Sequence, residues 1–515
     1  MNWRYPSLIL LLAVALLWPL MFRHVAGDVS VYAYIGSCIA HGLPPYQSAW
    51  DIKSPAIFFQ YALPLWLFPR SDVAVMMMDG LIALAGACAI FWTAVRLADK
   101  TAGAFAAVAW IIAYHGFASQ GWWGQPETAA AGLMAFLLFL ALQPDPLDEV
   151  DSFLGGLVTG VLVCYKLPFL LLGALLLPRY FTAIRRKLAL PATWPWLFGL
   201  VLVVSAVVFY FAAKGALYDL YVGAILSPFL MTRNLSMPLA DQARGFGRDV
   251  WLLVQWLPGV LCFAVVGAFF YPLRHPAHKK TLRGAFFLCL IVIMLQTRYF
   301  PYYWLLLMPV ICIYAGLGMS LAAANVKGIL AWQPLRTGLI VGLTLLASIP
   351  KMAFFWSSYF DGVRKGDKYA TLANYATNYG TGKHVLNAAR LVGLGESLRR
   401  ATAPNETILS FDMDPALNFY SGRMQPARFI YLWPLLTKGF ESLHWKEEYT
   451  RNIIAGKPTF FLLCRSSRKA STVEDGRKLL ERYPELKKFL AAQYIVVAHI
   501  GPIDVYRRKD YRRAS

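Results

Sequence analysis

Two acidic residues stand where an apolar stretch of the sequence meets a polar one. Asp28 belongs to HVAGDVSVYAYIG (24–36), which follows the apolar run 6–22, and Glu127 belongs to WWGQPET (122–128), at the start of another apolar run. A carboxylate at such a boundary can act as a general base toward a substrate hydroxyl. It can also simply complement the dipole of the helix that it opens. The neighbouring charges have to decide between these interpretations.

Two basic residues occur at boundaries of the same kind. Lys53 lies in PPYQSAWDIKSP (44–55) and Arg298 lies in QTRYFPYYW (296–304). Such side chains form charge-assisted hydrogen bonds with phosphate, although at a membrane surface they also reach toward lipid headgroups. Carboxylates beside cations suit acid–base work on a phosphate-bearing substrate, which favours a functional site. Nearby side chains are candidate substrate contacts or interfacial anchors: Tyr32, Tyr46, Asp51 and Tyr302.

The composition indicates where these residues must be held. The chain of 515 residues is 58% hydrophobic and only 15% charged, with a mean hydropathy of +0.50. Soluble proteins carry about 25% charged residues, so we predict a polytopic α-helical membrane protein. The formal charge of +21 is explained by Lys and Arg that flank membrane helices rather than by nucleic-acid binding. The seven cysteines form no CxxC pair, so neither a metal site nor a disulfide framework is indicated.

About eleven apolar runs approach the length needed to cross a bilayer. One pair of them, 152–164 and 167–180, is interrupted at Lys166-Leu167-Pro168 and could instead form one long span. A further stretch, 55–68, contains an internal proline and is too short to cross comfortably. The predicted spans are 6–22, 75–95, 102–119, 127–143, 152–164, 167–180, 192–213, 250–272, 284–297, 301–322 and 337–355.

The topology depends on whether 55–68 crosses the membrane. If it does not, the basic clusters within 96–100, 179–187, 274–283 and 327–336 all fall on one face, which the positive-inside rule makes cytoplasmic. The large first loop 23–74, the loops 119–126 and 214–249, the turn 296–301 and everything after 356 then share the external face. If 55–68 crosses, every later loop changes side. We adopt the first topology.

The last third of the sequence has a different character. Short apolar runs of strand length, at 407–411, 459–464 and 494–500, alternate with amphipathic helical stretches at 385–400 and 475–492. This alternation predicts a small α/β domain, so we divide the chain into a membrane module, 1–356, and an extracytoplasmic domain, 357–515. Residues 360–515 contain 26 Lys and Arg against 15 Asp and Glu. That excess suits an anionic headgroup or glycan, or is a solvated basic surface.

These motifs together resemble the GT-C glycosyltransferases, nearest to the bacterial relatives of protein O-mannosyltransferases and lipid A aminoarabinose transferases. The resemblance implies that Asp28 is the catalytic base and that Glu127 is a second acid of the site. It implies that Lys53 contacts the lipid-linked phosphate, and that Arg298 with Tyr299 forms a basic–aromatic pair that also contacts the donor phosphate.

The sequence departs from the family pattern at two places. The family's Lys-Pro-Pro segment reads Lys53-Ser54-Pro55 here, and no second acid or arginine follows Asp28 within three residues. No His/Glu pair stands beside Lys53, and Asp51 is the only acid near it. A divalent metal ion is therefore not supported by a clear ligand set, and no other cofactor is expected with certainty.

The resulting hypothesis is an enzyme of the bacterial inner membrane. It would transfer a sugar, with inversion, from a polyprenyl-phosphate donor to an extracytoplasmic acceptor such as lipopolysaccharide core, lipid A or another envelope glycan. The alternative is a transporter or flippase of lipid-linked saccharide, and a non-catalytic scaffold ranks below it. Transporters usually carry ionisable residues near the bilayer midplane and show related halves, whereas the residues above cluster at one interface.

The topology yields a first test. We expect alkaline phosphatase fused after Ser515 to be active and green fluorescent protein fused at the same position to be dark, because 357–515 is predicted to be extracytoplasmic. The reverse pattern would show that 55–68 crosses the membrane, which would also place Asp28 and Glu127 on opposite faces.

Overall fold

The structure is a computed structural model that describes residues 14–15, 18–118, 123–143, 147–180, 189–234, 237–297, 299–325, 356–375, 377, 385–413, 415–437, 439–440, 444–465 and 475–511. The chain forms two compact units. The first comprises Met1–Leu20, Asp79–Tyr210 and Met237–Trp356, and the second comprises Met21–Met78, Phe211–Ser236 and Ser357–Ser515. The first outer loop, which we assigned to the membrane module by sequence, thus belongs to the same unit as the C-terminal segment.

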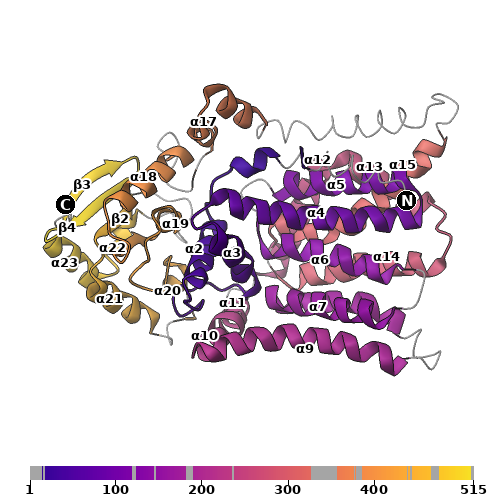
Figure 1. The fold of residues 1–515 in the computed structure, drawn as a ribbon, viewed down its shortest axis with the longest axis horizontal. Coiled ribbons are helices and arrows are strands. Elements are labelled where there is room, and N and C mark those ends of the chain that lie inside the picture. Colours follow the sequence, from indigo (N-terminus) through magenta and orange to yellow (C-terminus); the bar gives the residue numbers. More distant parts are fainter. Residues whose placement is uncertain are drawn as a thin grey trace. The chain divides into compact units, whose positions relative to one another are not determined.

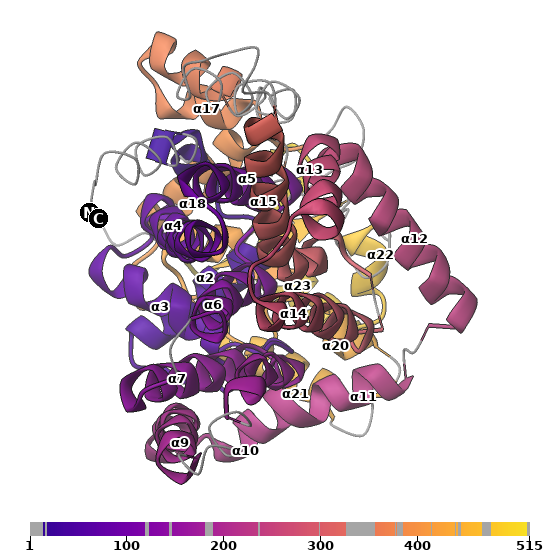
Figure 2. The ribbon, with the colours of Figure 1, turned by 90° about the vertical axis from the view of Figure 1, so that its right-hand side faces the viewer.

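The first unit is a bundle of apolar helices, which Figure 1 shows from the side and Figure 2 shows nearly end-on. Two glycines allow α13 and α15 to touch along their backbones. A Cβ atom at Gly267 would collide with the carbonyl oxygen of Tyr314, and one at Gly318 would collide with that of Phe263. Small residues at such crossings are typical of helix packing in membranes. The elements are α4 (Asp72–Leu97), α5 (Lys100–Ala118), α6 (Pro126–Ala141), α7 (Glu149–Tyr165), η2 (Leu167–Leu176), α9 (Ala189–Ala213), α12 (Leu239–Trp256), α13 (Pro258–Phe270), α14 (Pro276–Met294), η4 (Pro301–Leu307) and α15 (Met308–Asn325).

Several of these helices can cross a membrane. Among the described residues, Asp72–Leu97, Thr193–Ala213 and Pro301–Asn325 are long and apolar enough, and α12 with α13 would form a fourth span if their 99° bend is one broken crossing. The predicted spans 6–22 and 337–355 lie partly or wholly outside the described residues. A helical membrane protein is therefore confirmed, and the number of eleven spans stays a prediction.

The stretch 152–180 is not one long span. Helix α7 ends at Tyr165, Lys166 is extended with φ −169° and ψ 128°, and the 3₁₀ helix η2 begins at Leu167. Pro168 has no N–H to continue the helical hydrogen bonds. The two elements pack side by side, since a Cβ atom at Gly155 or Gly173 would meet Leu176 or Thr159 across the interface. The break therefore leaves Lys166 at a tight turn between two packed helices.

The second unit contains the first outer loop as well as the C-terminal segment. The stretch 55–68 forms α3, a helix of 12 residues that contains Pro64. At 1.5 Å per residue it is about 18 Å long, well short of the ~30 Å of a bilayer core. The helices are η1 (Trp18–Phe22), α2 (Asp28–Ala40), α3 (Ala56–Leu67), α10 (Leu217–Tyr221), the π-helical turn η3 (Val222–Leu226), α11 (Ser227–Asn234), α17 (Lys368–Ala373), α18 (Ala388–Arg400), α19 (Ala416–Ser421), α20 (Trp433–Leu436), α21 (Trp445–Gly456), α22 (Gly476–Leu480) and α23 (Pro484–Gln493).

A four-stranded mixed sheet forms the core of the C-terminal segment. Its order is β1 (Ile408–Phe411), β2 (Phe460–Cys464), β4 (Ile503–Arg508) and β3 (Tyr494–Ile500), with β1 and β2 parallel and the other pairs antiparallel. The three predicted strands are confirmed, whereas β4 was missed because IDVYRR is short and charged. The helical stretch predicted over 475–492 consists of two helices, α22 and α23, because Pro484 begins the second one.

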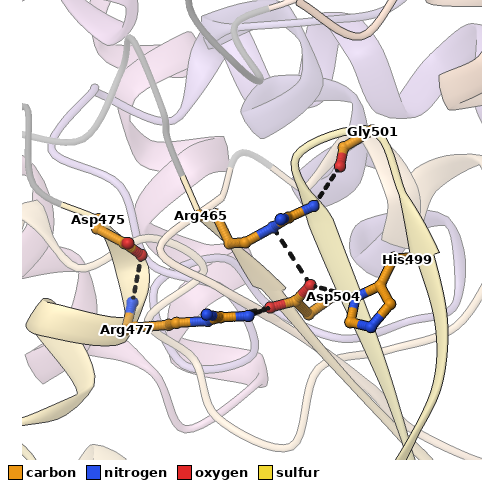
Figure 3. Close-up of polar contacts among 6 residues, drawn as sticks. All are labelled: Arg465, Asp475, Arg477, His499, Gly501 and Asp504. Carbon is orange, nitrogen blue, oxygen red and sulfur yellow. Dashed lines mark hydrogen bonds and ion pairs between the residues drawn. The ribbon is translucent and has the colours of Figure 1, made fainter. Parts of the chain in front are cut away.

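One buried carboxylate, at the end of the sheet where β3 turns into β4, contacts three basic side chains (Figure 3). Asp504 on β4 is fully buried, with Arg477 Nη2 at 2.7 Å, Arg465 Nε at 3.3 Å and His499 Nδ1 at 2.7 Å from its carboxylate oxygens. Burial alone would raise the pKa of Asp504. The hydrogen bonds from Arg477 and His499, with the charges of both arginines, outweigh burial and lower that pKa below its ordinary value.

Asp504 should therefore stabilise the sheet in an acid-sensitive way. A depressed carboxyl pKa contributes stability that is complete above about pH 4, the ordinary value, and is lost as the pH falls through the folded-state pKa. We expect Asp504→Asn to lower the opening free energy of the β4 amides by about 1.5–3 kcal/mol at pH 7. Hydrogen exchange of the full chain in detergent measures this, with the exposed Asp510→Asn as control. Equal protection in wild type and Asp504→Asn would refute the assignment.

Candidate functional site

Asp28 opens helix α2 in the second unit. The preceding residue, Gly27, has φ 63°, a backbone conformation that side chains disfavour, and its carbonyl accepts a hydrogen bond of 2.6 Å from the Ser30 hydroxyl. These contacts set the start of the helix and leave Asp28 in the first turn, half-buried. A negative charge is favourable at that helix end. The local sequence therefore determines that Asp28, the predicted base, lies at the start of this helix.

Lys53 lies beside the next turn of the same helix. Its Nζ atom is 5.9 Å from the centroid of the Tyr32 ring, within the range of a cation–π contact, and Tyr32 follows Asp28 by one helical turn. The Lys53 carbonyl accepts a hydrogen bond of 2.6 Å from the hydroxyl of Tyr46, a fully buried residue. The structure therefore brings Asp28, Tyr32, Tyr46 and Lys53 into one region of the second unit.

Asp51 is buried two residues before Lys53, and one of its oxygens accepts a hydrogen bond from the Tyr431 hydroxyl. Burial of that hydroxyl is the largest cause that raises the pKa of Tyr431 well above its ordinary value, followed by the charge and hydrogen bond of Asp51 and by the charge of Asp28. Asp28 is therefore close enough to Tyr431 to act on it. Tyr431 was not predicted as a site residue, because nothing in YLWPLL (431–436) distinguishes it from an interfacial aromatic residue.

The C-terminal segment 420–431 holds the outer loop along its length. The Val25 amide donates to the Tyr420 hydroxyl, the Gln425 amide donates to the Tyr34 hydroxyl, and the Trp50 amide donates to the Arg428 carbonyl, each at 2.8 Å. These contacts join residues that are more than 370 positions apart in the sequence.

Arg428 adds an ionic clamp to this attachment. Its guanidinium group pairs with Asp219 of α10 at 2.9 Å and with Glu448 of α21 at 2.8 Å, and also reaches the Tyr46 carbonyl at 3.3 Å. One arginine thereby connects the outer loop, the 211–236 segment and the C-terminal segment. Its two carboxylate partners leave it well compensated although it is largely buried.

Glu127 forms a second polar cluster in the first unit. It lies in the first turn of α6 with only 1% of its surface exposed, and its Oε1 atom is 2.8 Å from the Nζ atom of Lys166. Lys166 Nζ also donates to Gln296 Oε1 and lies 4.7 Å from the Tyr303 ring centroid. The second carboxylate oxygen, Oε2, is buried without a hydrogen-bond partner among the described residues.

Lys166 is the charged residue of this cluster that was not predicted from the sequence. The available signal was a lone lysine between two apolar runs, at the break before Pro168. A charge within apolar segments is a functional candidate by default, because it is costly to bury without a partner.

The other predicted site residues of the first unit have different surroundings. Tyr299 is buried against Phe246, and its carbonyl accepts a hydrogen bond of 2.9 Å from Arg248. Tyr302 is buried and stacks with Phe300. Arg298 lies outside the described residues, so its position stays a prediction. Among the residues that the structure does describe, no three His, Cys, Asp or Glu side chains are grouped as metal ligands.

Comparison with known proteins identifies the fold. No family model and no curated protein sequence matches the chain. ArnT from Cupriavidus metallidurans, solved with bound undecaprenyl phosphate, matches with a TM-score of 0.59 over 98% of both chains at 14% identity. The archaeal oligosaccharyltransferase AglB from Archaeoglobus fulgidus, with an inhibitory peptide and a dolichol-phosphate, matches with a TM-score of 0.50 over 99% of this chain and 75% of its own at 12% identity. The arabinofuranosyltransferase AftD from Mycobacteria matches with a TM-score of 0.51 over 99% of this chain and 40% of its own at 10% identity.

The Glu127–Lys166 pair predicts a stability effect. Removing one partner of a largely buried ion pair leaves an uncompensated charge and costs about 3–5 kcal/mol. We expect Lys166→Met to lower the free energy of unfolding by an amount near the lower end of this range, because Lys166 is 25% exposed. The double variant Lys166→Met with Glu127→Gln should recover most of that loss. Thermal unfolding in detergent measures both variants. Lys279→Met, at an exposed position of α14, is the control, and a Lys166→Met variant as stable as that control would contradict the pairing.

Proposed function

We propose that this chain, whose fold is the GT-C fold, is an integral-membrane glycosyltransferase that moves a sugar from a polyprenyl-phosphate donor to an extracytoplasmic acceptor with inversion. The observation that carries the proposal is the arrangement in the second unit, where the Lys53 ammonium group lies over the ring of Tyr32, one helical turn after Asp28 on α2. Two proteins of the same fold, ArnT and AglB, were solved with a polyprenyl phosphate bound. That combination supports a lipid-linked phosphate as the donor group.

Asp28 is the base in this proposal. It would take the proton of the acceptor hydroxyl while the hydroxyl oxygen attacks the anomeric carbon from the side opposite the phosphate. The bond between the anomeric carbon and the phosphate oxygen breaks, its electron pair remains on that oxygen, and the configuration inverts. Asp28 suits this role because it is half-buried at a helix N-terminus, where the ionised form is favoured. A phosphate leaving group needs no protonation by an acid.

Lys53 is the residue proposed to stabilise the leaving group. A fixed ammonium group near the developing phosphate charge lowers the barrier electrostatically, and the Tyr46 hydrogen bond to its carbonyl holds the Lys53 backbone in place. Arg298 and Tyr299, which precede η4 in the sequence, are proposed to assist. The supporting argument is chemical: Lys and Arg are the side chains that form strong charge-assisted hydrogen bonds with phosphate.

Glu127 is proposed to position the acceptor. Lys166 occupies one of its oxygens and leaves Oε2 without a partner among the described residues, so a substrate hydroxyl could satisfy that atom. An acceptor that is an anionic envelope glycan, such as lipopolysaccharide core or lipid A, is supported by the excess of Lys and Arg in 360–515. The proposed location is the bacterial inner membrane, with 357–515 on the extracytoplasmic side.

The decisive experiment replaces the base. In a strain that lacks this gene, mass spectrometry of envelope glycolipids should reveal a species that has lost one sugar, and the wild-type gene should restore it. We expect Asp28→Asn, at matched protein level, to restore almost none of it, because a general base contributes about 10²–10⁴-fold to the rate.

Asp361→Asn, at a half-exposed aspartate of the same unit, serves as the matched control and should restore the glycolipid fully. Full restoration by Asp28→Asn would exclude Asp28 as the base. A deletion strain with unchanged glycolipids would contradict a lipid-glycan acceptor altogether.

A further inference from the structure

Asp51 is a buried carboxylate with only half of its hydrogen-bonding capacity used. Its exposed fraction is 3%, and Oδ1 accepts a hydrogen bond from Tyr431. The other oxygen, Oδ2, is sealed from solvent and has no hydrogen-bond partner among the described residues. Buried charged oxygens are nearly always paired, because leaving one unpaired is costly. An unpaired Oδ2 therefore points to a partner that arrives with a ligand.

The surroundings hold Asp51 in one position. Its neighbour Trp50 pairs with Phe429 in a parallel β-bridge, and the Trp50 ring lies 6.0 Å from the ring of Phe429 and 4.9 Å from that of Trp445, measured between centroids. Tyr431 follows Phe429 by two residues, so the same bridge places both members of the Asp51–Tyr431 pair. The bridge therefore fixes where the Asp51 carboxylate lies.

The Tyr431 hydroxyl keeps its proton at any physiological pH. Burial raises its pKa first, and the charges of Asp51 and Asp28 raise it further. The hydroxyl is thus a permanent donor toward Oδ1, which leaves Oδ2 as the acceptor. The charge of Asp28, the proposed base, also acts on Tyr431.

We propose that Asp51 and Tyr431 form a hydroxyl-binding subsite for the sugar of the donor, with Oδ2 of Asp51 accepting a hydrogen bond from a sugar hydroxyl. This inference rests on the proposed function and deepens it. The two carboxylates repel phosphate oxygens, so the phosphate would lie toward Lys53 and the uncharged hydroxyls toward Asp51. Asp51 and Lys53 are two residues apart, which matches a phosphate and its attached sugar as adjacent groups of one ligand.

The test compares two kinds of lipid in detergent. One is bare undecaprenyl phosphate, and the other is undecaprenyl phosphate that carries glucose, xylose or galacturonic acid. The ratio of their affinities isolates the contribution of the sugar. We expect wild type to bind its best sugar-bearing lipid about tenfold to hundredfold more tightly than the bare lipid, as a hydrogen bond to a charged group allows.

The variants separate the subsite from the phosphate site. Asp51→Ala should bring the ratio close to one without weakening the binding of bare undecaprenyl phosphate, because it removes a negative charge that repels phosphate. Asp51→Asn keeps the shape of the side chain and replaces the alanine variant if that variant does not fold. It should lower the ratio about tenfold or less, because a neutral amide forms a weaker hydrogen bond than a carboxylate. Tyr431→Phe should lower it in the same direction. Lys53→Ala should weaken the binding of both lipids equally and leave the ratio as it is.

Tyr369→Phe is the matched control, because it removes another tyrosine–carboxylate hydrogen bond, of 2.7 Å to Glu396, between residues that have no role in the proposed site. It should leave both affinities unchanged. A wild-type ratio of one for all three sugars, or a ratio that Asp51→Ala does not change, would overturn the subsite. Failure of wild type to bind even bare undecaprenyl phosphate would instead overturn the proposed function.

Discussion

The candidate site depends on the attachment of the first outer loop to the segment 420–431. The Trp50 amide bonds to the Arg428 carbonyl, and Val25 and Tyr34 are held from the same segment. A loop of this length has a large conformational entropy when it is free. Asp28 and Lys53 keep a fixed relation because that loop is paired at several points. The C-terminal segment is therefore part of the framework of the site.

A second constraint is that buried charged groups need partners of opposite charge. Glu127 is paired with Lys166, Asp504 with Arg465 and Arg477, and Arg428 with Asp219 and Glu448. Burying any of these groups alone would be strongly unfavourable, so each one specifies its partner's position. The pairs differ in whether one carboxylate oxygen remains without a hydrogen-bond partner. Asp504 is engaged at both oxygens, as expected of a structural pair.

Glu127 and Asp51 form the contrasting class. Each has one oxygen bound by a protein group and one oxygen buried without a partner among the described residues. One such atom costs stability, and among the described residues Asp249 shares this pattern, with Oδ1 paired to Arg248 and Oδ2 buried without a partner. A half-satisfied carboxylate is therefore not sufficient to indicate a role toward ligands, and Glu127 and Asp51 enter the proposals because they also belong to the predicted site.

The sequence by itself determined the class of the protein and the local elements. Apolar runs of bilayer length predicted a helical membrane protein, and alternating short strands and amphipathic helices predicted a small α/β region. The acid after the first apolar run led to Asp28 as a predicted site residue. Each of these signals is local in the chain. Only the tertiary structure decided which distant residues meet. Lys166 reaches Glu127 because Pro168 breaks a helix and folds η2 back on α7, and Tyr431 reaches Asp51 through a β-bridge across about 380 positions. No local pattern encodes such contacts, since they depend on packing that the whole chain forms together.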